Sequence, residues 1–311
     1  MRVSKRGFSI TGLVLLTLIG LASIGTGLFD RLSLGVGTAS LRFECLEKDK
    51  WHRCHLPHTP YLLMTSDIHL SSPSGRWPET TQRFHLFMKE VSKNPPEIIF
   101  IAGDVVDNAT KDYPGSLSNW QDEWKIYKSI REAYGDIEFR QSYGTGHDWL
   151  NDAMLETLDL DVGGRRGVFK WRGLNFVWLS FGPGAFFPSA PEHHGDLNDE
   201  DYGWLEKKLS SLANVSLVFH VPLSTPLSTK FGALSDGRLI VLDPRDYLYK
   251  IIDTNRKKID MIFSGHIHKA FRDQFKGVPL FSCPFMDNNS FCTLQIIDGS
   301  SKVSQYRFVP N

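Results

Sequence analysis

The stretch EIIFIAGDVVD, residues 97–107, decides the fold that this sequence predicts. Its first part is an unbroken run of apolar residues rich in isoleucine, and the run ends at Gly103 and Asp104. A short apolar run bounded in this way is typical of a strand that is buried on both faces of a sheet. The stretch therefore predicts a central strand, with Asp104 in the loop at its carboxyl end.

Further apolar runs lie on both sides of this stretch. They are YLLMTSD (61–67), LNFVWLSFG (174–182), VSLVFHVPL (215–223) and DMIFSGHIH (260–268), and two closing strands are predicted in FCTLQIID (291–298) and VSQYRFV (303–309). Helical patterns lie between them, in TTQRFHLFMKEVSK (80–93) and DEDYGWLEKKLSSL (199–212). Strands that alternate with helices favour a layered α/β core.

The composition is that of a globular protein without an excess of either charge. The chain has 311 residues, 41% of them hydrophobic, and its 35 lysines and arginines balance 35 aspartates and glutamates. This length fits one large α/β domain or two small ones. Nucleic-acid-binding proteins normally carry a basic excess or a basic stripe, and the sequence has neither, so we expect no nucleic-acid partner.

The N-terminus has the pattern of a membrane segment. Arg2, Lys5 and Arg6 precede an uncharged run from Gly7 to Phe29, which as a helix can just cross a hydrocarbon core of about 30 Å. The positive flank predicts a cytosolic N-terminus, so the remaining chain would be lumenal or extracytoplasmic, in the secretory pathway of a eukaryote. We favour an uncleaved signal anchor; the alternative is a cleaved signal peptide with small residues at its cleavage site.

We therefore divide the chain into three parts. Residues 1–29 form a short cytosolic N-terminus and a signal-anchor helix, residues 30–60 form a juxtamembrane stem, and residues 61–311 form the main domain. The four cysteines occur as two near pairs, Cys45 with Cys54 and Cys283 with Cys292. An even number fits disulfides in an oxidising compartment, and we favour the two local pairings over four unpaired thiols. Three N-glycosylation sequons point to the same compartment, at Asn108, Asn214 and Asn288.

Metal-binding residue types cluster where the predicted strands end. They are Asp67, His69, Asp104, His220, His266 and His268. Carboxylates mixed with imidazoles suit zinc, iron or manganese. The set is too large for one tetrahedral ion, so two ions that share a bridging carboxylate are the natural solution. Such a pair clamps a phosphate and lowers the pKa of a bound water.

The order of these motifs resembles that of the calcineurin-like metallophosphoesterase superfamily. The motifs are SDIHL, AGDVVDN, GTGHD, VFHVPL and SGHIH, and the resemblance covers about residues 61–297. It implies a two-sheet β-sandwich flanked by helices, an αββα arrangement. It also implies hydrolysis of phosphate mono- or diesters with two divalent transition metals, which would be Mn, Fe or Zn.

The resemblance also implies a role for each ligand. One ion would be held by Asp67, His69 and His268, and the second by His220 and His266, with Asp104 as the bridge. His147 would protonate the leaving alkoxide or stabilise the transition state. Asp148 would orient His147 by accepting its other N–H.

The sequence departs from the family pattern at Gly146. The family has an asparagine there, whose amide oxygen binds the second metal, and glycine has no side chain to replace it. We expect a weakened second site. Three interpretations follow: an active enzyme with a loosely held second metal, a binding protein with one metal or none, or a shifted loop in which Asp148 or Asn151 reaches the metal. The intact remainder of the ligand set favours activity.

The segment GDVVDNATKDYPGSLSNWQDEWKIYKSI resembles the transmembrane protein sixty-two family of eukaryotic membrane proteins. KWRGLNFVWLS and PEIIFIAGDVVD suit that family and equally the lumenal phosphoesterase that trims ethanolamine phosphate from GPI anchors. These resemblances imply a phosphoester partner that includes lipid- or glycan-linked phosphates, and contact with a membrane through the N-terminal helix.

Overall fold

The structure is a computed structural model. It describes residues 41–47, 50–58, 60–73, 75, 77–107, 117–144, 148, 164–180, 192–193, 197–233, 239–242 and 246–310. The predicted signal anchor, Gly146 and His147 lie outside the described residues. Leu41–Pro310 forms one compact unit. Within the described part of the chain, no helix is both long and apolar enough to cross a membrane.

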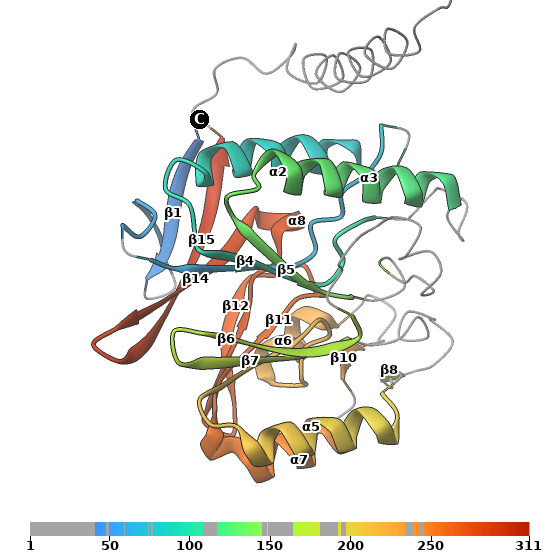
Figure 1. Ribbon diagram of the computed structural model, residues 1–311, viewed down its shortest axis with the longest axis vertical. Helices are drawn as coiled ribbons and strands as arrows, with labels where there is room; N and C mark the ends of the chain where they lie inside the picture. Colours follow the sequence, from blue (N-terminus) through green and yellow to red (C-terminus); the bar gives the residue numbers. More distant parts are fainter. Residues whose placement is uncertain are drawn as a thin grey trace, which may run out of the picture. The chain divides into compact units, whose positions relative to one another are not determined.

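Two sheets form the centre of the molecule (Figure 1). The first has seven strands in the order β2 (Lys50–Cys54), β1 (Leu41–Glu47), β15 (Ser300–Pro310), β14 (Ser290–Ile297), β3 (Leu62–Thr65), β4 (Ile98–Ala102) and β5 (Glu138–Ser142). Strands β3, β4 and β5 are parallel, whereas β1, β2, β14 and β15 pair antiparallel.

The second sheet has six strands and also mixes both pairing modes. Its order is β12 (Phe271–Phe275), β13 (Val278–Ser282), β11 (Ile259–Ser264), β9 (Val215–Phe219), β7 (Leu174–Leu179) and β6 (Arg166–Trp171). The four inner strands are parallel, and the two edge strands are antiparallel. A separate two-stranded pair joins β8 (Glu192–His193) to β10 (Leu239–Leu242).

Helices cover both outer faces of the sandwich (Figure 1). On the first sheet lie α2 (Pro78–Val91) and α3 (Leu117–Ala133), and beside the second lie α5 (Asp199–Ser211) and α7 (Tyr247–Asn255). Shorter helices are α6 (Pro226–Gly232), η2 (Arg256–Lys258) and α8 (Phe285–Asn288). The predicted two-sheet α/β fold flanked by helices is therefore confirmed, with helix, sheet, sheet and helix as its layers.

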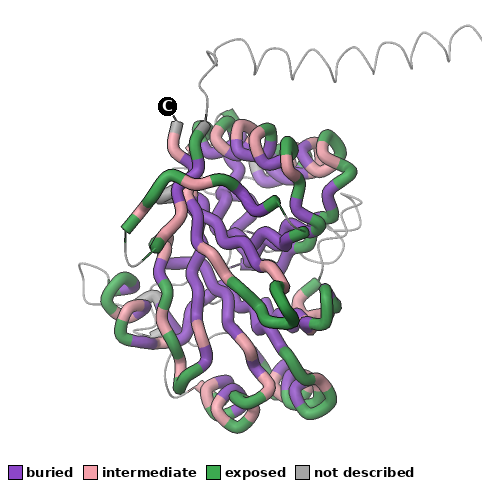
Figure 2. The backbone as a smooth tube through the Cα atoms, turned by 90° about the vertical axis from the view of Figure 1, so that its left-hand side faces the viewer, coloured by how far each residue is buried: buried purple, intermediate pink, exposed green. Residues whose placement is uncertain are grey.

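Strand β4 shows why the stretch at residues 97–107 decides this fold. Successive side chains of a strand point to opposite faces. Ile99 and Ile101 pack under α2 and α3, whereas Ile98 and Phe100 pack between the two sheets. All of β4 is buried, and full burial of one such side chain stabilises the fold by about 1.5–3 kcal/mol. Figure 2 shows the resulting buried interior along the strands.

The structure differs from the sequence expectation in residues 30–60. Within this predicted stem, Leu41–Glu47 forms β1 and Lys50–Cys54 forms β2, and both strands extend the first sheet. Phe43 packs into the core beneath the sheet, and the Arg307 side chain of β15 donates two hydrogen bonds to Glu44 Oε2 at 2.8 and 2.6 Å. These partners are more than 260 residues away in the chain, so no local pattern points to them.

Both predicted local disulfides are present. Cys45–Cys54 links β1 to β2, and Cys283–Cys292 links the segment after β13 to β14. The second disulfide therefore connects the two sheets. Thr65 at the end of β3 donates to the carbonyl oxygen of Cys283 at 3.3 Å, which places this disulfide close to the strand end that carries Asp67.

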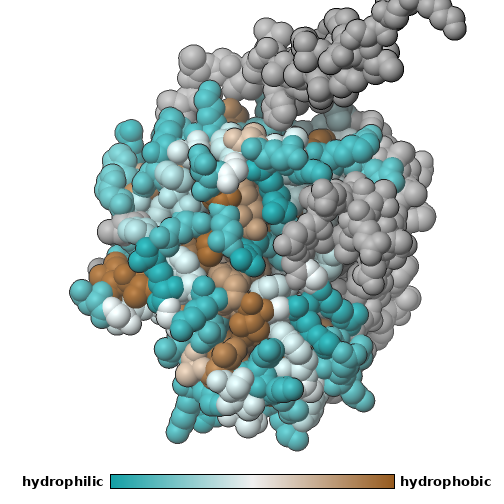
Figure 3. All heavy atoms as spheres, in the orientation of Figure 1, coloured by the Kyte–Doolittle hydropathy of each residue, from teal (hydrophilic) through white to brown (hydrophobic). Residues whose placement is uncertain are grey.

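Most of the face in Figure 3 is hydrophilic, with hydrophobic side chains in a patch near its centre and at the tip of the β14–β15 hairpin on its left side. Ile297 in this tip is 42% exposed, whereas Ile296 in β14 and Val303 in β15 are partly buried against the core between the sheets.

Candidate metal centre

The six predicted ligands lie at the carboxyl ends of four strands from both sheets. Asp67 and His69 follow β3, Asp104 follows β4, His220 follows β9, and the pair His266 and His268 follows β11. The carboxyl ends of neighbouring parallel strands meet at one edge of a sheet, where loops carry functional groups. The sandwich brings this edge of one sheet against the same edge of the other.

The structure brings these side chains together in two groups of three. The first ligand group is Asp67, His69 and His268, and the second ligand group is Asp104, His220 and His266. In each group the candidate ligand atoms lie within 4.8 Å of one another. These are the residues that the sequence motifs singled out.

In the first ligand group the two imidazoles face each other. His69 Nε2 lies 3.1 Å from His268 Nε2, and Asp67 Oδ1 lies 3.4 Å from His268 Nε2. The carboxylate of Asp67 also accepts the backbone N–H of His266, with its two oxygens 2.9 and 3.0 Å away. The carboxylate is thus held in place from the loop after β11.

The second ligand group touches the first. His220 Nε2 lies 3.0 Å from Asp104 Oδ2 and 3.8 Å from Asp67 Oδ1. Asp104 Oδ2 is also 3.8 Å from His69 Nε2. The carboxylate of Asp104 therefore lies between the two groups, where a bridging ligand is expected.

Five of the six ligand residues have positive φ angles. The values are 52° for Asp67, 47° for His69, 52° for Asp104, 70° for His266 and 49° for His268. Non-glycine residues rarely adopt this region, and each such residue costs about 1–3 kcal/mol. Strained backbone clusters at functional sites because the geometry there serves the site rather than the stability of the fold. A cluster at the motif residues therefore supports a functional role.

The donor set fits divalent transition metals. The Nδ1–H of His220 donates to the carbonyl oxygen of Ala102 at 2.8 Å, and this fixes the tautomer that leaves Nε2 available as a ligand. Nε2 is buried and has no aligned hydrogen bond, although it faces Asp104. Buried imidazole nitrogens and carboxylate oxygens that face a common point suit zinc, iron or manganese.

Charged residues of the two ligand groups shift each other's pKa values. Burial alone would raise the pKa of Asp67, but the imidazoles of His220 and His268 lower it to about 2. Burial alone would lower the pKa of His220, but the carboxylates of Asp104 and Asp67 raise it to about 10. An imidazolium at His220 thus balances the buried carboxylates whenever no metal provides the positive charge.

Two glycines permit the close packing of the loops after β4 and β5. A Cβ atom at Gly144 would collide with the backbone nitrogen and the carboxylate of Asp104. Gly103 has a φ of +85°, and a Cβ atom there would lie 2.7 Å from His220 Nδ1. A side chain at either position would displace a candidate ligand residue. The backbone at these two glycines therefore packs directly against the metal centre.

Asp148 holds the same two loops together. One of its oxygens accepts the backbone N–H groups of Val105 and Val106 at 2.8 and 3.2 Å, and the other accepts that of Gly144 at 2.9 Å. Burial and the nearby Asp104 carboxylate raise the pKa of Asp148 to about 7, against the effect of these amide donors. The expected contact with His147 falls outside the described residues, whereas the link between the loops was not predicted.

Three residues around His69 were also missed by the sequence motifs. Asp107 is fully buried, with Oδ1 3.8 Å from His69 Nδ1. Thr80 in the first turn of α2 donates to the carbonyl oxygen of His69. The ring of Trp77 meets that of His69 edge to face, with centroids 5.3 Å apart. The second aspartate in GDVVD is the one signal in the sequence that points to any of them.

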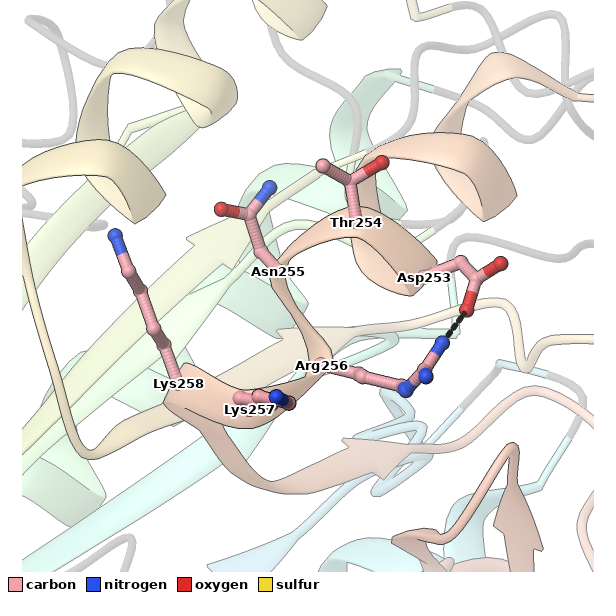
Figure 4. A pocket seen from close by; sticks show the side chains of 6 residues that line it. All are labelled: Asp253, Thr254, Asn255, Arg256, Lys257 and Lys258. Carbon is pink, nitrogen blue, oxygen red and sulfur yellow. Dashed lines mark hydrogen bonds and ion pairs between the residues drawn. The ribbon is translucent and has the colours of Figure 1, made fainter.

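A surface cavity lies elsewhere. It is lined by residues 253–258 at the end of α7 and in η2 (Figure 4). This segment precedes the amino end of β11, whereas His266 follows the carboxyl end, and six residues of strand span about 20 Å. Two of its cations already have partners, since Arg256 pairs with Asp253 and Lys258 donates to carbonyl oxygens at the end of α5.

The family model for calcineurin-like phosphoesterases matches residues 61–270 of the chain. The chain belongs to this family. The match ends after His268, so all six candidate ligand residues lie within it. Family members normally use a dimetal site, and the two ligand groups are candidates for it.

A solved structure with a TM-score above 0.5 shows the same fold, and two others are similar at lower scores. A dimetal phosphatase from Danio rerio is 10% identical, with 81% of this chain and 98% of that chain covered and a TM-score of 0.59. GAP50, the anchor in the inner membrane complex of Plasmodium, is 12% identical with coverages of 81% and 84% and a TM-score of 0.48. The phosphopantetheinyl hydrolase of Mycobacterium tuberculosis is 15% identical with coverages of 72% and 89% and a TM-score of 0.41. No match was found among curated protein sequences.

Proposed function

We propose that the protein is a metal-dependent hydrolase of phosphate mono- or diesters that is anchored in a membrane and faces the lumen. The observation that carries the catalytic part is the pair of adjoining ligand groups, whose residues adopt strained backbone at the ends of strands from two sheets. Folding stability gives no reason to accumulate such strain and buried charge at one edge.

The ligand groups divide the binding of two ions between them. The first ligand group would hold one divalent transition metal and the second ligand group another, with Asp104 placed to contact both. When bound, such ions supply positive charge that polarises a phosphoryl oxygen and stabilises the transition state. The amides of Val105, Val106 and Gly144 hold Asp148, which follows His147 in the sequence.

His147 is the proposed proton donor. In this role its imidazolium would pass a proton to the alkoxide oxygen that leaves phosphorus, as general acid catalysis requires. Its neighbour Asp148 anchors the loop by accepting three backbone N–H groups, so the position of His147 would depend on Asp148 through the backbone.

The membrane and lumenal parts rest on other observations. The uncharged run between Gly7 and Phe29, preceded by three cationic residues, supports a signal anchor. Two disulfides support an oxidising compartment, since such bonds persist there and are rare in the cytosol. Together with the likeness to the transmembrane protein sixty-two family, they favour a substrate that is a lipid- or glycan-linked phosphate.

A second candidate function follows from Gly146. Without the asparagine of the family motif, the protein would be a binding module that keeps the fold and holds one metal or none. Elemental mass spectrometry of the purified full-length protein separates the two, together with hydrolysis of p-nitrophenyl phosphate and bis-p-nitrophenyl phosphate. Two metal equivalents and hydrolysis that collapses in His147→Ala are expected for the enzyme. One equivalent or less, with no hydrolysis, would instead favour the binding module.

A further inference from the structure

Trp77 occupies the N-cap position of α2 without capping the helix. Ser, Thr, Asp and Asn are preferred there because their side chains accept a free N–H of the first turn. Trp77 makes no such hydrogen bond, and Pro78 follows it as the first residue of the helix. A residue that breaks a local rule without a local gain is expected at a functional position.

The tryptophan is held firmly beside a metal-ligand residue. Its backbone N–H donates to Ser71 Oγ at 3.2 Å, and its carbonyl oxygen accepts Thr80 Oγ1 at 2.8 Å. Thr80 Oγ1 also contacts the carbonyl oxygen of His69. The ring of Trp77 meets the ring of His69 at 77°, with centroids 5.3 Å apart. The N-terminus of α2 therefore fixes Trp77 and His69 relative to each other.

Among the ligand residues, the metal centre is exposed at His268. The side chain of His268 is 28% exposed, whereas no other ligand residue is more than 8% exposed. The rings of His268 and His69 are 5.0 Å apart. Trp77 is half-buried and its ring contacts that of His69, whose other face-to-edge neighbour in the centre is the partly exposed His268.

We propose that Trp77 forms an aromatic wall at the mouth of the metal centre and selects phosphoesters whose organic group has a flat, apolar face next to the phosphate. The inference rests on the proposed function, which places the phosphate between the ligand groups. A tryptophan ring offers a large rigid surface, and pairs of aromatic rings gain free energy beyond that of burying apolar area. A ligand with a ring substituent should therefore bind roughly threefold to tenfold more tightly than one with a methyl group.

The test compares phenylphosphonate with methylphosphonate, which differ only in the organic group and are not hydrolysed. Calorimetric titration of the full-length, Mn²⁺-loaded protein gives both affinities, and elemental analysis gives the metal content of each variant. The variants are Trp77→Phe, Trp77→Leu and, as a matched control, Trp204→Leu. Trp204 is a half-buried tryptophan on α5, where it contacts the side chains of Arg166 and Lys208.

We expect a preference of roughly threefold to tenfold for phenylphosphonate in the wild type. Trp77→Phe and Trp204→Leu should keep it, and Trp77→Leu should lose it with unchanged metal content. A preference that persists in Trp77→Leu overturns the inference. An equal loss of affinity for both phosphonates, accompanied by loss of metal, also overturns the inference. The ring of Trp77 would then serve only to position His69.

The same titrations separate this inference from the proposed function. A wild type that hydrolyses p-nitrophenyl phosphate but binds both phosphonates equally overturns the aromatic wall alone. A wild type that takes up no Mn²⁺ and binds neither phosphonate nor inorganic phosphate overturns the proposed function and the wall with it.

Discussion

The two ligand groups differ in exposure and in completeness. The first ligand group includes His268, whose side chain is 28% exposed, whereas every residue of the second ligand group is buried. In the family pattern that the sequence resembles, an asparagine at position 146 would complete the second group. By that pattern the open group has its full set of side chains, and the enclosed group lacks one. We infer that the first group binds metal tightly and admits the substrate, while the second binds metal weakly.

Replacement of Asp104 should weaken metal binding by both ligand groups, and it should give the largest loss of metal affinity. Asp104→Asn removes the charge that lies between His220 and His69. Changes to groups around a metal typically cost 10- to 100-fold in affinity, so loss of the bridging charge should cost at least about 100-fold at both sites. Elemental analysis and hydrolysis of p-nitrophenyl phosphate measure this loss.

Asp260→Asn is the matched control for Asp104→Asn. Asp260 is half-buried in β11 near its amino end, away from the ligand residues that follow the strand. It should keep its metals and activity. An Asp104→Asn protein that retained two tightly bound equivalents would contradict the assignment of Asp104 as the bridge.

Replacement of one histidine in each group should separate the groups. Calorimetric titration of the metal-free protein with Mn²⁺ should show one tight and one weak class of site. His268→Ala should weaken the tight class, and His266→Ala the weak class, each by about 100-fold, because each removes one direct ligand. The comparison fails if both variants weaken the same class.

Restoration of the missing asparagine should reduce the difference in metal affinity between the two ligand groups. Gly146→Asn adds an amide oxygen that can serve as a metal ligand, and the weak class should tighten by about tenfold, the lower end of the cost of losing a ligand-shell group. Gly203→Asn in α5 is the control, because a side chain there meets no neighbouring atom. If the metal affinity of the weak class is unchanged in Gly146→Asn, another group already fills the ligand position of the asparagine.

Metal uptake by the second group should depend on pH more steeply than uptake by the first. Without metal, His220 has a pKa raised to about 10, so it holds a proton at pH 7 that the metal must displace. Affinity should therefore rise with pH between pH 6 and 8, by up to about tenfold per unit for one displaced proton. Asp67 has a pKa lowered to about 2 and is already ionised across this range, so it adds no pH dependence to the metal affinity.

Titrations in two buffers with different heats of ionisation count the protons released on metal uptake. About one proton per metal is expected for the weak class at pH 7. Uptake without proton release at that class would contradict a protonated His220 in the metal-free protein.

The sequence patterns predicted the strands well, and they placed the candidate ligand residues at the strand ends, because these features are local. Strand β4 is apolar on both faces since it is buried between helices and the other sheet, and that burial is visible as an unbroken apolar run. The ligands follow strand ends, where the chain must leave the sheet. The near cysteine pairs likewise became disulfides across short segments of chain.

The patterns failed where distant residues decide the structure. The hairpin of β1 and β2 belongs to the sheet because β15 pairs with β1, and Glu44 meets Arg307 from the other end of the chain. The contacts of Trp77 and Thr80 with His69 depend on how α2 lies against the loop after β3. No spacing in the sequence encodes such contacts, because they join elements that are brought together only by packing.

The order of residues alone establishes that the chain builds an α/β fold with carboxylates and imidazoles at its strand ends, since burial and chain reversal leave local signatures. It also establishes the absence of a side chain at position 146. Only the packing of two sheets decides that the six ligands form two adjoining groups, one open and one enclosed, because each group draws its side chains from both sheets. Proximity between strands of different sheets is a property of the folded chain.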